Sequence, residues 1–375
     1  MRTFVPKTFL ILALGVAAVL SAGRVIGQGT LLEPLEGFFA PAGAVFSADG
    51  RTLFVTNSAR VDYGMMVGRG AVSRVTVGED GTLSMDRQKF TEGLSGPLGI
   101  TVLPASLGEF PAGTLAVAVG NRWVAKDRAN RITDPRERET GLVFLDPHTG
   151  ARLGSAYLGA GSPIEAALGQ PVSDPSHIVF DPAGNAYLTD VAGFGLKPLP
   201  GEINRPGIVR LSAAALLAIV RGEAPEASQV SFLDVPEVPG GIAFWPKNSM
   251  LYWATGPGYG DLAGAVLRLP GGDFGPSGSI DTVFKETQPM VGACLTPDGS
   301  LIVAHNNGDI GVLKGGRGKV KTVKFRRPTV FLSPGQPAAT TLTDGRVLVV
   351  VPEMASSGQP AWRHRLQRFT LPSGY

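Results

Sequence analysis

The stretch PSHIVFDPAGNAYLTD, residues 175–190, decides the fold of this chain. It contains a proline with small residues, a short apolar segment, the turn PAGN and a second apolar segment. Such turns contain residues that tolerate positive φ or form Asx turns, as tight connections between antiparallel strands require. The stretch therefore predicts two neighbouring antiparallel strands.

The same unit recurs along the 375 residues, so that six copies are present. The other five are PAGAVFSADGRTLFVTN from Pro41, PLGITVLP with GTLAVAVGN from Pro97, PGGIAFWPKNSMLYWATG from Pro239, VGACLTPDGSLIVAHN from Val291 and PAATTLTDGRVLVVVPE from Pro337. Third strands rich in β-branched residues are predicted to begin near residues 70, 141, 207, 264, 309 and 364. Fourth strands are predicted at residues 228–234, 280–285 and 319–325.

Six units of about four strands each predict an all-β fold, a six-bladed β-propeller with four antiparallel strands per blade. The last unit lacks a fourth strand, and residues 30–38 lie just upstream of the first unit. We expect this N-terminal strand to complete the last blade and close the ring, which removes an open sheet edge. The segment SAAALLAIVRGE from Ser212 is the one predicted helix.

The N-terminus has the pattern of a secretory signal, because Arg2 and Lys7 precede an apolar run of 12 residues at 9–20. A membrane-spanning helix needs about 20 apolar residues. We expect residues 1–27 to be a signal peptide, cut after Ala22 or Gly27, and residues 28–375 to form the propeller domain. The mature protein is then periplasmic or extracellular, with no membrane span.

Charge and cysteine content exclude two further classes of protein. A cut after Gly27 removes three basic residues and leaves 31 basic against 31 acidic ones, so no global field attracts nucleic acid. Cys294 is the only cysteine, which excludes an intramolecular disulfide. We expect a monomer.

The candidate site lies at one mouth of the central channel, where the loops from second to third strands are long. Asn57, Asp190 and Glu353 end second strands and supply oxygen ligands of the kind that Ca²⁺ or another divalent metal binds. Asn121, Arg122 and Asn306 are candidate ligand-binding residues at the same mouth. The alternative is that these strand-end side chains only hydrogen-bond neighbouring strand ends.

Two histidines are candidate catalytic residues. His177 replaces the glycine of other repeats at the start of an inner strand, and His305 ends a second strand. Either imidazole is suited to general-base chemistry near neutral pH if it faces a ligand, whereas a structural hydrogen bond is the alternative role. No GxSxG elbow, HExxH helix, P-loop or dinucleotide fingerprint is present.

The repeats resemble the blade signature shared by the senescence-marker-protein/gluconolactonase family, the strictosidine-synthase-like proteins and the NHL-repeat propellers. Gluconolactonase-like enzymes hold a divalent metal with a Glu before the first inner strand and Asn or Asp before other inner strands. The matching positions here are Ala42, Leu98, Ser176, Gly240, Val291 and Ala338, none of which is a good metal ligand. A metal would therefore have to be held one layer higher, by Asn57, Asp190 and Glu353.

The resemblance implies a propeller whose activity its fold does not specify. One expectation is an exported hydrolase of the lactonase or esterase type that acts on a small molecule at the channel mouth. The alternative is a non-catalytic propeller that binds a ligand or a protein partner in the cell envelope. The sequence leaves open whether the protein is an enzyme.

Overall fold

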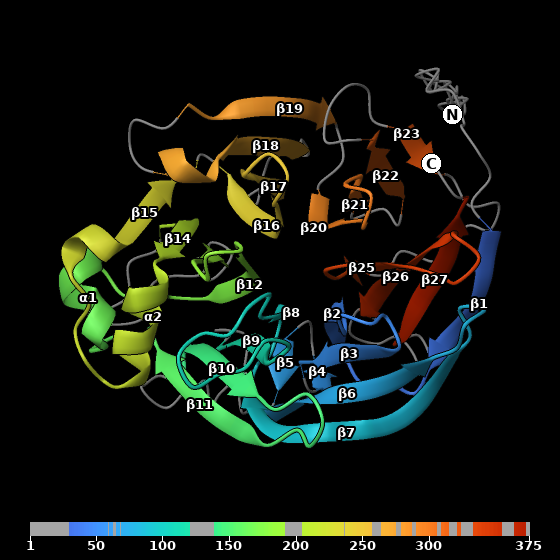
Figure 1. The fold of residues 1–375 in the computed structure, drawn as a ribbon, viewed down its shortest axis with the longest axis horizontal. Coiled ribbons are helices and arrows are strands. Elements are labelled where there is room, and N and C mark those ends of the chain that lie inside the picture. Colours follow the sequence, from blue (N-terminus) through green and yellow to red (C-terminus); the bar gives the residue numbers. More distant parts are fainter. Residues whose placement is uncertain are drawn as a thin grey trace, which may run out of the picture.

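The computed structural model describes residues 30–58, 60–62, 65–67, 69–120, 139–191, 205–235, 237–256, 264–274, 279–286, 290–305, 309–314, 321–323, 333–354 and 364–372. These residues form six β-sheets around one axis, which confirms the predicted six-bladed propeller (Figure 1). In each blade the first strand lies nearest the axis and the fourth lies at the rim.

The first three blades follow the chain in order. Blade 1 consists of β2 (Pro41–Phe46), β3 (Thr52–Asn57), β6 (Arg69–Val77) and β7 (Leu83–Ser95), with the hairpin β4 (Arg60–Asp62) and β5 (Met65–Val67) between β3 and β6. Blade 2 consists of β8 (Ile100–Val102), β9 (Leu115–Val119), β10 (Gly141–Leu145) and β11 (Arg152–Tyr157). Blade 3 consists of β12 (Pro175–Phe180), β13 (Ala186–Asp190), β14 (Gly207–Leu211) and β15 (Val230–Asp234).

The last three blades complete the ring. Blade 4 consists of β16 (Val238–Trp245), β17 (Met250–Gly256), β18 (Gly264–Pro270) and β19 (Asp281–Glu286). Blade 5 consists of β20 (Met290–Leu295), β21 (Leu301–His305), β22 (Ile310–Leu313) and β23 (Lys321–Val323). Blade 6 consists of β25 (Ala338–Thr341), β26 (Val347–Met354), β27 (Arg365–Leu371) and β1 (Thr30–Glu36), and β24 (Ser333–Pro334) also pairs with β26.

The ring closes as the sequence predicts. The N-terminal strand β1 pairs antiparallel with β27, the last strand of the chain, from Thr30 opposite Thr370 to Glu36 opposite Arg365. Because this pairing covers the outer edge of blade 6, the first and last parts of the chain hold each other in one sheet.

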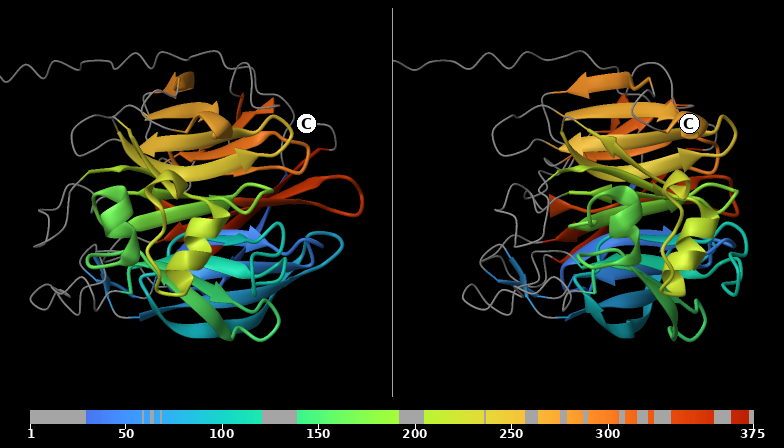
Figure 2. Two further views of the ribbon diagram at one scale, coloured as in Figure 1. Left: turned by 60° about the vertical axis from the view of Figure 1, so that its left-hand side comes forward. Right: turned by 90° about the vertical axis from the view of Figure 1, so that its left-hand side faces the viewer.

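The two α-helices lie outside the ring beside blades 2 and 3 (Figures 1 and 2). Helix α2 (Ala213–Val220) confirms the predicted helix, and its N-cap Ser212 accepts a hydrogen bond from the Ala215 N–H at 3.1 Å. Helix α1 (Pro163–Leu168) and the short 3₁₀ helices η3 (Ala227–Gln229) and η4 (Gly271–Asp273) are additional. Among the described residues, no helix is long and apolar enough to cross a membrane.

The fourth strands of blades 1 and 2, β7 and β11, are not among the predicted strands. Both lie at the rim and expose much of their surface, so they lack the apolar pattern of an inner strand. Helix α1 was also missed, although a proline occupies its first turn and Gly169, at φ 77°, ends it.

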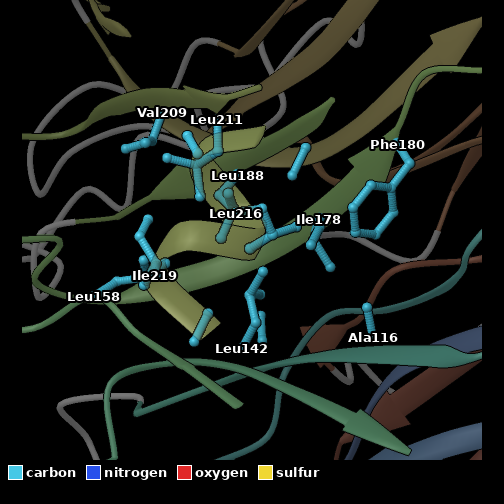
Figure 3. Packing of buried hydrophobic residues seen from close by; sticks show 14 of the residues in the cluster. Ala116, Leu142, Leu158, Ile178, Phe180, Leu188, Val209, Leu211, Leu216 and Ile219 are labelled. Carbon is cyan, nitrogen blue, oxygen red and sulfur yellow. The ribbon is translucent and has the colours of Figure 1, made fainter. Parts of the chain in front are cut away.

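Six apolar clusters fill the six spaces between adjacent blades. In β9, Leu115 and Val117 face blade 1, whereas Ala116 between them belongs to the cluster shared with blade 3. Figure 3 shows that shared cluster, with Leu216 and Ile219 of α2 packed into it. Since successive side chains of a strand point to opposite faces, a strand between two blades is apolar at every position.

The inner strands contact one another directly around the axis. The backbone N–H of Gly99 in blade 2 donates to the backbone carbonyl oxygen of Ser176 in blade 3 at 2.6 Å. The backbone N–H of Gln336 in blade 6 donates to the backbone carbonyl oxygen of Ala42 in blade 1 at 2.8 Å. A Cβ atom at Gly99 would lie 2.6 Å from both the Cα of His177 and the Ser176 oxygen. Only glycine therefore allows the two backbones to approach this closely.

We expect Gly99→Ala to lower the free energy of unfolding by about 1 to 3 kcal/mol, because its methyl group meets backbone that cannot rotate away. Gly256→Ala is the matched control, since among the described residues a Cβ at this strand-end glycine would meet only the Met290 backbone oxygen, at 3.8 Å. Urea denaturation of the two variants and the wild type measures the difference. Equal stability of both variants would contradict close packing of blades 2 and 3 at the axis.

Candidate functional site

The polar residues that end the second strands occupy equivalent positions in their blades. Asn57 and Asp190 each lie opposite the proline that begins the inner strand, and His305 lies opposite Met290, which begins β20. Thr255 lies opposite Pro239, the second residue of β16. The register therefore gives these residues closely equivalent positions in their own blades.

In two blades the side chain at this position binds the backbone just before the inner strand. The Asp190 carboxylate accepts the N–H of Ser173 at 2.8 Å and that of Asp174 at 2.9 Å. The Asn57 carboxamide oxygen accepts the Phe39 N–H at 3.1 Å. These bonds, buried at Asp190 and partly buried at Asn57, hold the segment that leads into each blade, because an unpaired backbone N–H in the interior is unfavourable.

The amide nitrogen of the Asn57 side chain also forms hydrogen bonds. This nitrogen donates to the Val55 oxygen at 3.2 Å and to the Ser73 hydroxyl at 2.9 Å. With three hydrogen bonds inside blade 1, this side chain is directed toward its own sheet.

Glu353 forms an ion pair within blade 6. Its carboxylate accepts from the Arg365 guanidinium at 3.0 Å, across the β26–β27 pair. Burial raises the pKa of Glu353, and Arg365 and Gln367 partly offset this shift because they stabilise the carboxylate.

These partners bear on the predicted metal site. Asn57, Asp190 and Glu353 come from blades 1, 3 and 6, and their oxygens already accept hydrogen bonds from backbone or from Arg365. The part of the chain that the structure describes contains no group of three or more His, Cys, Asp or Glu side chains placed to hold a metal ion. The oxygens of these three residues are thus hydrogen-bonded within or beside their own blades, and a Ca²⁺ site formed by them stays a prediction.

His177 lies at the narrow ring of inner strands. The backbone N–H of His177 donates to the Thr189 hydroxyl at 3.0 Å. In the same way, the backbone N–H of Gly43 donates to the Thr56 hydroxyl at 2.8 Å in blade 1. The two residues are therefore equivalent, which agrees with the replacement of glycine by histidine seen in the repeats.

The imidazole of His177 contacts a neighbouring hydroxyl. Its Nδ1 lies 2.9 Å from the Ser176 Oγ, and both side chains are buried. Burial lowers the pKa of His177 from 6.5 to about 4, so the ring is neutral at physiological pH. In the tautomer whose Nδ1 has no proton, this nitrogen accepts the Ser176 hydroxyl and the ring is arranged as a base toward Ser176. The sequence pattern indicates no catalytic role for Ser176, although this residue directly precedes the histidine.

His305 lies in blade 5 and is buried at the end of β21. Burial lowers its pKa, and the charge of Asp309 acts in the opposite direction. The predicted ligand-binding residues Asn121, Arg122 and Asn306 lie outside the described residues, as do most of the long loops between second and third strands.

Comparison with known proteins establishes the fold alone. No protein-family model matches the chain, and no curated protein matches its sequence. A gluconolactonase from Xanthomonas campestris is similar in structure, with a TM-score of 0.54 at 14% identity over 92% of this chain and 91% of that one.

Two other solved structures are similarly close. An α-L-arabinofuranosidase from Fusarium graminearum has a TM-score of 0.53 at 13% identity, over 92% of this chain and 98% of its own. A putative oxidoreductase (glucose dehydrogenase) from Thermus thermophilus has a TM-score of 0.52 at 16% identity, over 91% and 100%. The chain is thus a six-bladed propeller whose structural neighbours include a gluconolactonase. Because the three neighbours are named for different reactions, its activity must be inferred from its own residues.

We expect the buried His177 ring to make the protein less stable in acid. Between pH 6.5 and about 4 the unfolded chain binds a proton here that the folded chain does not, so stability falls as the pH is lowered through this window. Lowering the pH from about 7 to about 4.5 should therefore destabilise the wild type by about 2 to 3 kcal/mol more than His177→Gln.

Urea denaturation at the two pH values measures this difference. His148→Gln, which removes an exposed histidine from a turn, is the matched control and should behave as the wild type. If the free energy of unfolding fell equally on acidification in the wild type and in His177→Gln, the folded protein would have to accept a proton at this ring as readily as the unfolded chain.

Proposed function

We propose that the protein is an exported hydrolase of a small ester or lactone, with Ser176 as nucleophile and His177 as general base. The observation that carries this proposal is the 2.9 Å contact between the Ser176 Oγ and the His177 Nδ1. Nucleophile and base within about 2.6 to 3.2 Å are the usual geometry of an activated hydroxyl.

In the first half of the proposed reaction, the His177 Nδ1 takes the Ser176 proton as Oγ bonds to the substrate carbonyl carbon. The carbonyl π electrons move to oxygen and give a tetrahedral intermediate. As this intermediate collapses, the C–O bond to the leaving alkoxide breaks, and the protonated imidazole returns its proton to that oxygen. The result is an acyl group on Ser176 and a free alcohol; for a lactone, the alcohol remains on the acyl chain.

Water completes the cycle by the same route. His177 takes a proton from water as the hydroxide adds to the acyl carbon, and the proton passes to the Ser176 oxygen as that bond breaks. The low pKa of His177 keeps the ring neutral and able to accept a proton at neutral pH, although it also makes the ring a weaker base.

We expect Ser176→Ala and His177→Ala to lower kcat by about 10² to 10⁴ on the best substrate of a panel of uncharged lactones and esters. Ser84→Ala, on the exposed rim strand β7, is the matched control and should keep full turnover. Melting temperatures verify that each variant is folded. Absence of turnover across the panel, or unchanged kcat in folded Ser176→Ala, would exclude this function.

A second candidate function is a binding propeller of the cell envelope. The hydrogen bonds of Asn57 and Asp190 to the backbone of their own blades favour it, because they give these strand-end side chains a structural role. A rigid ring of six blades has broad faces for a partner protein.

Purification from the native envelope separates the two candidates and tests export. If the binding candidate is correct, a partner protein should copurify in constant proportion, and the purified chain should lack turnover. Export predicts that the mass of the recovered chain lacks the first 22 or 27 residues. A chain that retains Met1 would contradict cleavage of the signal.

A further inference from the structure

A cavity of about 330 Å³ lies on the axis at the face formed by the turns between first and second strands. All six inner strands contribute to its lining, and turn residues such as Ser47 and Pro297 lie at its rim. Neither Ser176 nor His177 lines it, and the predicted mouth lies at the other end of the axis, where the inner strands begin. This axial cavity is therefore separate from the proposed hydrolase site.

The inner strands turn backbone, and not side chains, toward this cavity. Ala44 and Phe46 of β2 belong to the apolar cluster between blades 6 and 1, whereas Val45 packs against the cluster between blades 1 and 2. Successive side chains thus enter the two spaces beside the strand, and its free edge is left to face the axis.

The hydrogen bonds of blade 1 show which backbone groups face the axis. In an antiparallel pair, residues that exchange hydrogen bonds alternate with residues whose N–H and C=O point away from the partner strand. The Ser47 N–H donates to the Thr52 oxygen, so Phe46, one residue earlier, turns its N–H and C=O away from β3. The bond from the Ala44 N–H to the backbone oxygen of Gln336 in blade 6 confirms this alternation, because Ala44 lies on the same free edge.

Blades 3 and 5 repeat this arrangement. The N–H groups of Asp181 and Thr296 form the equivalent hydrogen bonds to their second strands. The residues before them, Phe180 and Leu295, therefore occupy the place of Phe46 on their own free edges. All three of these residues line the cavity. Among the described residues, no hydrogen bond is formed by their outward N–H and C=O groups.

These three free edges come from alternate blades. They belong to β2, β12 and β20, which Figure 1 shows on three sides of the centre of the ring. Alternate blades in a ring of six are about 120° apart. The cavity therefore offers three N–H donors and three carbonyl acceptors, directed at the axis from three sides. Backbone groups in an interior need partners, which are then water or a ligand.

The lining also sets the charge of a ligand. None of the described residues that line the cavity is Asp, Glu, Lys, Arg or His. A charged ligand would lose its hydration there without gaining an opposite charge, so the cavity favours a neutral one. The volume of the cavity is at the lower end of the range of small-molecule sites.

We propose that the axial cavity binds an uncharged cyclic polyol with hydroxyl groups on alternate carbons of a six-membered ring. A hydroxyl both donates and accepts, so one such group can pair with the N–H and C=O of one strand edge. Three hydroxyls on alternate carbons have the same angular spacing as the edges at Phe46, Phe180 and Leu295. The proposal does not depend on the hydrolase activity.

The experiment measures binding of radiolabelled cis-cyclohexane-1,3,5-triol to the full chain by equilibrium dialysis. We expect saturable binding of one triol per chain. Cyclohexane-1,2,3-triol has the same composition but places its hydroxyls on one side of the ring, where they cannot reach all three edges. It should bind at least about tenfold more weakly, as expected for the loss of one hydrogen-bonded hydroxyl.

Two variants at one position test the backbone donor in blade 5. Leu295→Pro removes an N–H that the β20–β21 ladder does not use, and proline is tolerated on a free strand edge. Leu295→Ala is the matched control, because it shortens the side chain and keeps the N–H. We expect the 1,3,5-triol to bind Leu295→Pro about tenfold more weakly than Leu295→Ala. Circular dichroism verifies that both variants are folded.

Three results would overturn the proposal. The first is no saturable binding of the 1,3,5-triol, as expected if the cavity holds water only. The second is equal affinity for the two triols in the wild type, a comparison that needs no variant to fold. The third is equal affinity of folded Leu295→Pro and Leu295→Ala for the 1,3,5-triol. Because turnover is not measured, failure here is distinguishable from failure of the hydrolase proposal.

Discussion

The fold depends on the direct contact between inner strands around the axis. At Gly99 and Gly43 the backbone of one blade lies against the backbone of the next, so closely that a Cβ would clash with Ser176 or Leu98. Backbone hydrogen bonds join blade 2 to blade 3 and blade 6 to blade 1 at this level. Because the inner strands meet here without side chains between them, the blades are drawn into a closed ring and the channel narrows to a waist.

This waist gives the two ends of the axis different chemistry. At the end where inner strands begin, polar side chains such as Asp190 and Asn57 are occupied with the backbone that leads into each blade. At the other end the strands diverge and leave a cavity with an uncharged wall. His177 lies at the waist itself, where a side chain has replaced the glycine and contacts Ser176. The histidine that replaces a glycine of the repeat is therefore also the one whose ring contacts the neighbouring hydroxyl.

The six clusters between blades explain why the repeats are so visible in the sequence. A middle strand such as β9 is buried on both faces, so Leu115, Ala116 and Val117 are all apolar and form a continuous run. Rim strands lack this constraint. Most positions of β7 are exposed or half-buried, with four exposed residues in a row, and for this reason its place could not be found from apolar pattern alone.

The sequence by itself determined the six blades, the order of their strands, the closure by residues 30–36 and the helix after Ser212, because each depends on local pattern and turn chemistry. It also identified Asn57, Asp190 and His305 as equivalent positions, since the repeat sets their register. Only the tertiary structure decided where their side chains point, that Ser176 contacts His177, and that Gln336 reaches from blade 6 toward blade 2. Periodicity specifies which strands pair. The direction of a polar side chain and the shape of a cavity are set by residues of other blades, which are distant in the sequence.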